Sequence, residues 1–128
     1  MVRKLLIGQK KTTTKPKELR AVISNVLREC YLLDDTGLDH GELSTIDKHV
    51  MVGKNRNTII DFESSSKKRI TSNVSAATQA IFIGTGLAKI IRLKIDVPRK
   101  DKIIRLVRNY KKLRTQESFD ELLFGLKL

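Results

Sequence analysis

Apolar residues recur in the first long segment of the chain with the spacing of an amphipathic helix. Across residues 15–33 they fall three or four positions apart, at Leu19, Val22, Ile23, Val26, Leu27, Cys30 and Tyr31. This spacing places all of them on one side of a helix. Pro16 suits the first turn, where a missing N–H leaves no helical hydrogen bond unmade. We predict a helix here, whose apolar stripe faces a core or a second copy of the chain.

Shorter apolar runs before and after this helix are typical of strands. Residues 2–8 predict a short strand that Gly8 closes. Residues 34–47 are acidic and polar and predict a long loop. Residues 48–63 contain two β-forming runs on either side of a turn-rich segment, which predicts a hairpin with Lys54 and Arg56 at its tip.

Residues 70–97 are the ambiguous part of the pattern. Residues 72–80 favour a helix, and residues 81–83 then favour a short strand. Two interpretations compete for residues 87–97, after the turn at Gly84 and Gly86. Apolar and charged residues alternate from Ile91 to Val97, as in a half-buried strand. The alternative is a helix-turn-helix, with residues 71–83 and 87–95 as its two helices and with Lys89 and Arg92 pointing outward. The clean alternation leads us to prefer the strand.

The C-terminal segment predicts two helices. Pro98 ends the preceding element, and residues 99–114 form an amphipathic helix in which Lys and Arg occupy most positions outside the apolar stripe. A capping box of Ser118 and Glu121 opens a closing helix within residues 116–128. We therefore expect residues 1–128 to form one small α+β domain, with an N-terminal amphipathic helix, a central hairpin and a basic C-terminal helix.

Charge is distributed very unevenly along this pattern. The 128 residues carry a formal net charge of +12. Residues 64–115 hold 14 basic and 2 acidic side chains, whereas residues 34–63 hold 3 basic and 7 acidic ones. Cations concentrated in one half of a chain are expected of a surface that binds a polyanion.

We predict a non-enzymatic protein that contacts the phosphate backbone of duplex DNA or structured RNA. Aromatic residues are scarce, which disfavours a stacking platform for single strands. Arg105, Arg108 and Lys112 are spaced to follow one line of phosphates along a helix. The full predicted set of nucleic-acid-binding residues is Lys67, Lys68, Arg69, Lys89, Arg92, Arg99, Lys100, Lys102, Arg105, Arg108, Lys111, Lys112 and Arg114.

Three other functions compete with this prediction. Asp61 and Glu63, two positions apart on a strand, could form a metal-dependent nuclease site with Asp47, beside Lys67 and Lys68. A ribonucleoprotein or viral assembly protein would use the same basic surface plus a contact between copies, made by the first helix or by residues 122–128. A dimeric helix-turn-helix regulator is the third.

Residue types argue against a resident cofactor or metal. Asp35, Asp39 and Glu42 do not match the ligand spacing of a calcium loop. His40, His49 and Cys30 are too few for a zinc site of four such ligands. Gly84 and Gly86 alone do not make a nucleotide-binding loop.

The expected setting is intracellular, with self-association possible. The sequence has no apolar run of membrane-spanning length. Its single cysteine, Cys30, fits a reducing compartment and is expected to be a buried core thiol.

Overall fold

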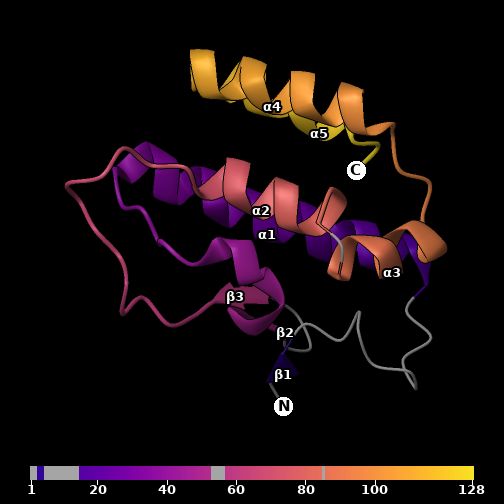
Figure 1. Ribbon diagram of the computed structural model, residues 1–128, viewed down its shortest axis with the longest axis horizontal. Helices are drawn as coiled ribbons and strands as arrows, with labels where there is room; N and C mark the ends of the chain where they lie inside the picture. The colour runs from indigo at the N-terminus through magenta and orange to yellow at the C-terminus, as the bar shows by residue number, and fades with distance from the viewer. Residues whose placement is uncertain (1–2, 5–14, 53–56, 85) are drawn as a thin grey trace.

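The protein is a small α+β domain in which helices predominate. The computed structural model describes residues 3–4, 15–52, 57–84 and 86–128. Its helices are α1 (Pro16–Thr36), the 3₁₀ helix η2 (Leu43–Lys48), α2 (Asn73–Phe82), α3 (Leu87–Lys94), α4 (Lys100–Leu113) and α5 (Gln116–Gly125). Its strands are β1 (Arg3–Lys4), β2 (Val50–Val52) and β3 (Asn57–Ile59). In Figure 1, α4 and α5 lie on one side of α1 and α2, and the sheet lies on the other.

The predicted hairpin is present, in a sheet of three antiparallel strands ordered β1-β2-β3. Val50 pairs with Ile59 and Met51 with Thr58. β1 overlaps the predicted strand at residues 2–8, whose other residues lie outside the described part. Lys54 and Arg56, the predicted hairpin tip, also lie outside it.

The first helix confirms the apolar stripe and is longer than predicted. Leu19, Ile23, Val26, Leu27 and Cys30 are buried within the chain, so the stripe belongs to the core. The helix continues to Thr36 and ends at Gly37, which adopts a left-handed conformation with φ of 83°. The segment predicted as a loop at 34–47 therefore contains the last turn of α1 and most of η2.

Both strands predicted between residues 81 and 97 are wrong. α2 runs through residues 81 and 82, and residues 87–94 form α3. The alternation misled because Leu93, one of its apolar members, is 83% exposed. Ile91 and Ile95 are buried, and Leu87 and Ile90 are half-buried. These four residues share one face when the segment is helical, as the helix-turn-helix alternative predicted.

α2 lies at the centre of the packing. It contacts η2, α1, α3 and α4, and seven of its residues are buried. Ser75, Ala77 and Thr78 are small, so neighbouring elements approach α2 closely. Among the described helices, none by itself has the length and apolar content to cross a membrane. Only α2 and α3 taken together, bent by 66°, meet that criterion.

An aromatic cluster joins α4 and α5 to α1. The rings of Tyr31 and Phe119 stack with centroids 4.7 Å apart, and Tyr110 meets both edge-on. The last helix starts one turn earlier than its predicted cap, because Thr115 is the N-cap and exchanges hydrogen bonds with Ser118. Glu121 instead accepts a hydrogen bond from Asn109 of α4.

Candidate nucleic-acid interface

The outer side of α4 presents the most concentrated basic surface among the described residues. The helix contains six cationic side chains and one acidic one, and buries Ile103, Val107 and Tyr110 against the core. Arg105, Arg108 and Lys112 point away from that buried side and are exposed, as the helical spacing predicted. Lys100, Lys102 and Lys111 are exposed beside them.

This surface is held in place by the way that α4 is attached to α1 and α2. The Tyr110 hydroxyl donates a 2.7 Å hydrogen bond to Asp34 Oδ2 at the end of α1. Asp34 also accepts hydrogen bonds from the backbone and side-chain nitrogens of Asn73, at 2.9 Å each, at the start of α2. Burial, and then the adjacent Asp34 carboxylate, raise the pKa of Tyr110 well above its ordinary value. One carboxylate therefore joins three helices.

Sequence analysis missed this role of Asp34. It lies just beyond the predicted end of the first helix, in a segment read as an acidic loop. Its partners are 39 and 76 positions away in the chain. The apolar periodicity carries no signal for such a contact.

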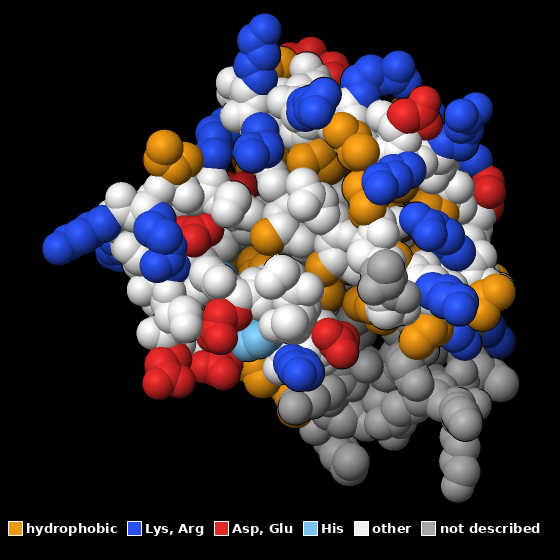
Figure 2. Space-filling model, in the orientation of Figure 1, with side chains coloured by type: hydrophobic (Ala, Val, Ile, Leu, Met, Phe, Trp, Pro, Cys, Tyr) orange, Lys and Arg blue, Asp and Glu red, His pale blue; other side chains and the backbone are white. Residues whose placement is uncertain are grey.

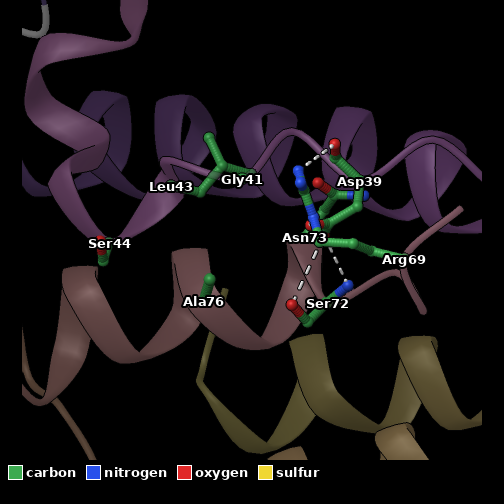
Figure 3. Close-up of a pocket in the computed structure, with 8 residues that line it drawn as sticks. All are labelled: Asp39, Gly41, Leu43, Ser44, Arg69, Ser72, Asn73 and Ala76. Carbon is green, nitrogen blue, oxygen red and sulfur yellow. Dashed lines mark hydrogen bonds and ion pairs between the residues drawn. The ribbon is translucent and has the colours of Figure 1, made fainter. Parts of the chain in front are cut away.

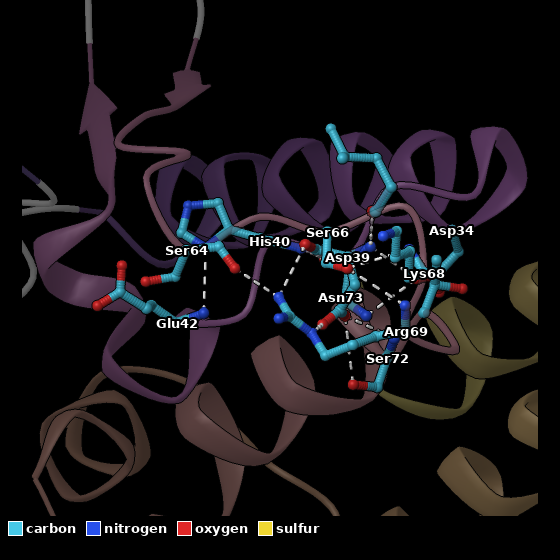
Figure 4. A network of polar contacts seen from close by, with 12 residues as sticks. Asp34, Asp39, His40, Glu42, Ser64, Ser66, Lys68, Arg69, Ser72 and Asn73 are labelled. Atoms are coloured by element: carbon cyan, nitrogen blue, oxygen red, sulfur yellow. Dashed lines mark hydrogen bonds and ion pairs between the residues drawn. The ribbon is translucent and has the colours of Figure 1, made fainter.

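Two of the predicted nucleic-acid-binding arginines, Arg69 and Arg114, make hydrogen bonds within the fold. Arg69 Nε lies 2.9 Å from Asp39 Oδ2, and Arg69 Nη2 donates to the Ser64 carbonyl. Arg114 donates to both the side chain and the carbonyl of Thr71, at 2.7 and 2.6 Å. Both guanidinium groups therefore stabilise the segment that leads into α2. Figure 4 shows the Arg69 contacts as part of a continuous polar network.

The remaining predicted residues fall in three places. Lys67 and Lys68 are exposed on the loop before α2. Lys89 and Arg92 are exposed on α3, but Arg92 donates a 2.8 Å hydrogen bond to the carbonyl of Phe82 at the end of α2. Arg99 is exposed, and its Nε lies 3.5 Å from Asp101 Oδ1. In Figure 2, Lys and Arg side chains gather over the upper and right-hand parts of the view, and acidic ones at the lower left.

Comparison with known proteins gives a relative. No protein-family model matches the sequence. The chain is 30% identical over 97 residues to uncharacterized protein MJ1211 of Methanocaldococcus jannaschii, an alignment that covers 74% of this chain and 83% of the relative. The chain belongs to the MJ1211 family. Because that name describes no activity, function has to be inferred from the geometry of this chain.

A cavity of about 270 Å³ in this MJ1211-family chain lies beside the start of α2. Asp39, Arg69, Ser72 and Asn73 line one side, and Figure 3 shows Asp39 bridging Arg69 and Ser72. Because Asp39 and Arg69 compensate each other's charge, the cavity presents no unpaired cation from this pair to an anionic ligand.

The carboxylates predicted for a nuclease do not come together among the described residues. The structure places Asp61 beside Glu42 and His49, and leaves Asp47 and Glu63 outside that group. Sequence analysis did consider His49 and Glu42, but separately and in other roles. Their convergence depends on how the segment after β3 passes the end of η2.

Proposed function

We propose that this chain is a non-enzymatic nucleic-acid-binding protein that holds the phosphate backbone of duplex DNA or structured RNA on the outer side of α4. The supporting observation is the row of Arg105, Arg108 and Lys112. These three side chains are exposed and form no hydrogen bond or ion pair with other described residues. A rise of about 1.5 Å per residue spreads them over roughly 10 Å.

The buried aromatic residues support a duplex or folded partner. Tyr110 and Phe119 are buried, and Tyr31 packs against them. The faces of these three rings are thus not available to stack on unpaired bases, which is how single-strand platforms gain much of their affinity. Phe62 and Phe124 are exposed, but they are two isolated rings outside α4. Backbone contact and shape then account for recognition.

We place the contact on α4 rather than on a helix-turn-helix recognition helix. α2, the intervening turn and α3 do have the order of that motif. However, Arg92, one of the two outward cations of the alternative, is bonded to Phe82. α3 therefore offers less free positive charge than α4.

We further propose an intracellular location and a capacity to self-associate. Cys30 is buried and free, which fits a reducing compartment. The stripe of α1 is occupied by the core, so a contact between copies would use exposed apolar residues. Phe124, in the C-terminal segment considered above, is 87% exposed.

The test measures how binding affinity depends on salt concentration. Fluorescence anisotropy reports binding to labelled duplex DNA, single-stranded DNA and RNA. The α4 variant is Arg105→Ala, Arg108→Ala and Lys112→Ala combined. If all three contact phosphates of B-DNA, the slope of log K against log salt should become shallower by about 2.7. The matched control removes three exposed cations at the start and middle of α1, by Lys15→Ala, Lys17→Ala and Arg28→Ala.

The control should retain nearly the wild-type slope. Equal losses in the two variants would show that total charge, and not the α4 surface, drives binding. Failure of the wild-type chain to bind any of the three nucleic acids at low salt would refute the proposal.

A further inference from the structure

Three potential metal ligands converge between η2 and the segment that follows β3. His49 Nε2 lies 3.7 Å from a carboxylate oxygen of Glu42 and 3.9 Å from one of Asp61. One ligand atom from each of the three residues lies within 4.8 Å of the other two. In a tetrahedral site with bonds of about 2.1 Å, ligand atoms are separated by about 3.4 Å. Small side-chain movements would therefore bring all three onto one ion.

His49 is oriented as a metal-binding histidine. Its Nδ1 lies 2.9 Å from the carbonyl oxygen of Thr45 and donates to it. This hydrogen bond leaves Nε2 facing the two carboxylates, with no hydrogen bond to another described residue. The side chain is only 8% exposed, and its free nitrogen, Nε2, is directed at the cluster. A histidine that donates its other N–H to a carbonyl is the usual arrangement around a protein-bound metal.

His40 holds the two segments that carry the carboxylates. It is fully buried. Its Nδ1 accepts from the backbone N–H of Glu42 at 3.2 Å, and its Nε2 donates to the carbonyl of Ile60 at 2.9 Å. Ile60 immediately precedes Asp61. Figure 4 shows the contact between His40 and Glu42. His40 is thus a positioning residue that fixes the backbone at one ligand and next to another.

The backbone at Asp61 is also unusual. Asp61 has a φ of 62°, a left-handed conformation that is uncommon for residues other than glycine. This conformation and the His40–Ile60 hydrogen bond together determine where the Asp61 carboxylate lies.

We propose that Glu42, His49 and Asp61 bind a divalent transition-metal ion of the zinc class. One imidazole nitrogen and two carboxylate oxygens suit Zn²⁺, Co²⁺ or Mn²⁺. They suit Mg²⁺ and Ca²⁺ poorly, because these ions take oxygen ligands. Three protein ligands leave at least one coordination position for water.

The local charge favours a cation although the whole chain is basic. The ligands lie within residues 34–63, which carry four more acidic than basic side chains. In Figure 2, acidic side chains lie next to the small patch of histidine that reaches the surface. The proposal is independent of nucleic-acid binding, because it uses none of the α4 cations.

The test titrates Co²⁺ into the full chain, free of any purification tag, and follows the visible absorption of the protein-bound ion. Wild-type protein should bind one Co²⁺, and Zn²⁺ should displace it. Glu42→Gln and Asp61→Asn each remove one ligand charge with little change in shape, and Asn tolerates the left-handed backbone at 61. Each should weaken binding by at least about 100-fold, the upper end of the range for losing an outer-shell partner.

Asp47→Asn and Glu63→Gln are the matched controls, since both residues are exposed carboxylates nearby that lie outside the cluster. Both controls should retain wild-type affinity. Circular dichroism will confirm that each variant is folded, and ¹⁵N spectra of the histidine rings should show Zn²⁺ shifting His49 Nε2. Absence of binding, unaltered binding in Asp61→Asn, or equal losses in the controls would overturn the proposal. In these outcomes the three residues form only an ion pair between His49 and the carboxylates.

Discussion

Replacing Asp34 with alanine should weaken the attachment of both α2 and α4 to the end of α1. Asp34 Oδ1 and Oδ2 accept from the Tyr110 hydroxyl, from two nitrogens of Asn73 and, at 3.4 Å, from the backbone nitrogen of Val74. The substitution removes the acceptor from all of these donors. It also removes a negative charge from the N-terminus of α2, where the helix dipole favours one.

The expected cost follows from which donors are left unpaired. Tyr110 and Asn73 are each only 1% exposed, so water does not readily replace Asp34. The side-chain nitrogen of Asn73 keeps its hydrogen bond to the Leu38 carbonyl. The Tyr110 hydroxyl and the Asn73 backbone N–H lose their partner. An unsatisfied buried donor costs about 1–3 kcal/mol, so Asp34→Ala should lower the free energy of unfolding by about 3 kcal/mol.

The assay is urea unfolding followed by circular dichroism, with Asp35→Ala as the matched control. Asp35 is the adjacent carboxylate, is exposed, and has no hydrogen bond to another described residue. Its replacement should change the free energy of unfolding by less than about 0.5 kcal/mol. Tyr110→Phe alone should cost about 1 kcal/mol. The double variant should then be less destabilised than the sum of the single variants.

The reasoning would be refuted if Asp34→Ala and Asp35→Ala were equally stable. Strict additivity of Asp34→Ala and Tyr110→Phe would likewise show that the hydrogen bond between the two side chains contributes nothing to the attachment of α4.

Three further changes probe the same structure. Burial and Asp34 raise the pKa of Tyr110 in the folded chain, so the unfolded chain loses the phenolic proton first as the pH rises above about 10. The free energy of unfolding should therefore fall with rising pH in urea unfolding, and it should fall less in Tyr110→Phe. Gly41→Ala should cost at least 1 kcal/mol more than Gly37→Ala in thermal unfolding. Both glycines have positive φ, but only at Gly41 would a Cβ come within 2.8 Å of the Ser64 carbonyl oxygen; equal costs would contradict this. Arg69→Ala should lower the melting temperature, whereas the double variant Lys67→Ala, Lys68→Ala should leave it unchanged. Of these three side chains, only that of Arg69 contacts Asp39 and Ser64. The same loss in both variants would show that Arg69 has no special structural role.

Sequence periodicity was most reliable where an element has one buried side. α1 and α4 each bury a continuous apolar stripe, and their predicted ranges differ from the structure by at most a few residues. It failed at residues 87–97, where the alternation includes the exposed Leu93 and where α2 covers the helical face. A short helix and a short strand can share such a pattern, and the neighbouring element decides between them.

The sequence by itself determined the α+β composition, the core stripes of α1 and α4, and the segregation of basic and acidic charge. These are local properties, because they depend on the order of residues within one segment. Only the tertiary structure decided which charges are free. Arg69 and Arg114 are bonded to groups far away in the chain, whereas Arg105, Arg108 and Lys112 are not. The convergence of Glu42, His49 and Asp61 was decided in the same way, since it depends on how η2 packs beside the segment after β3.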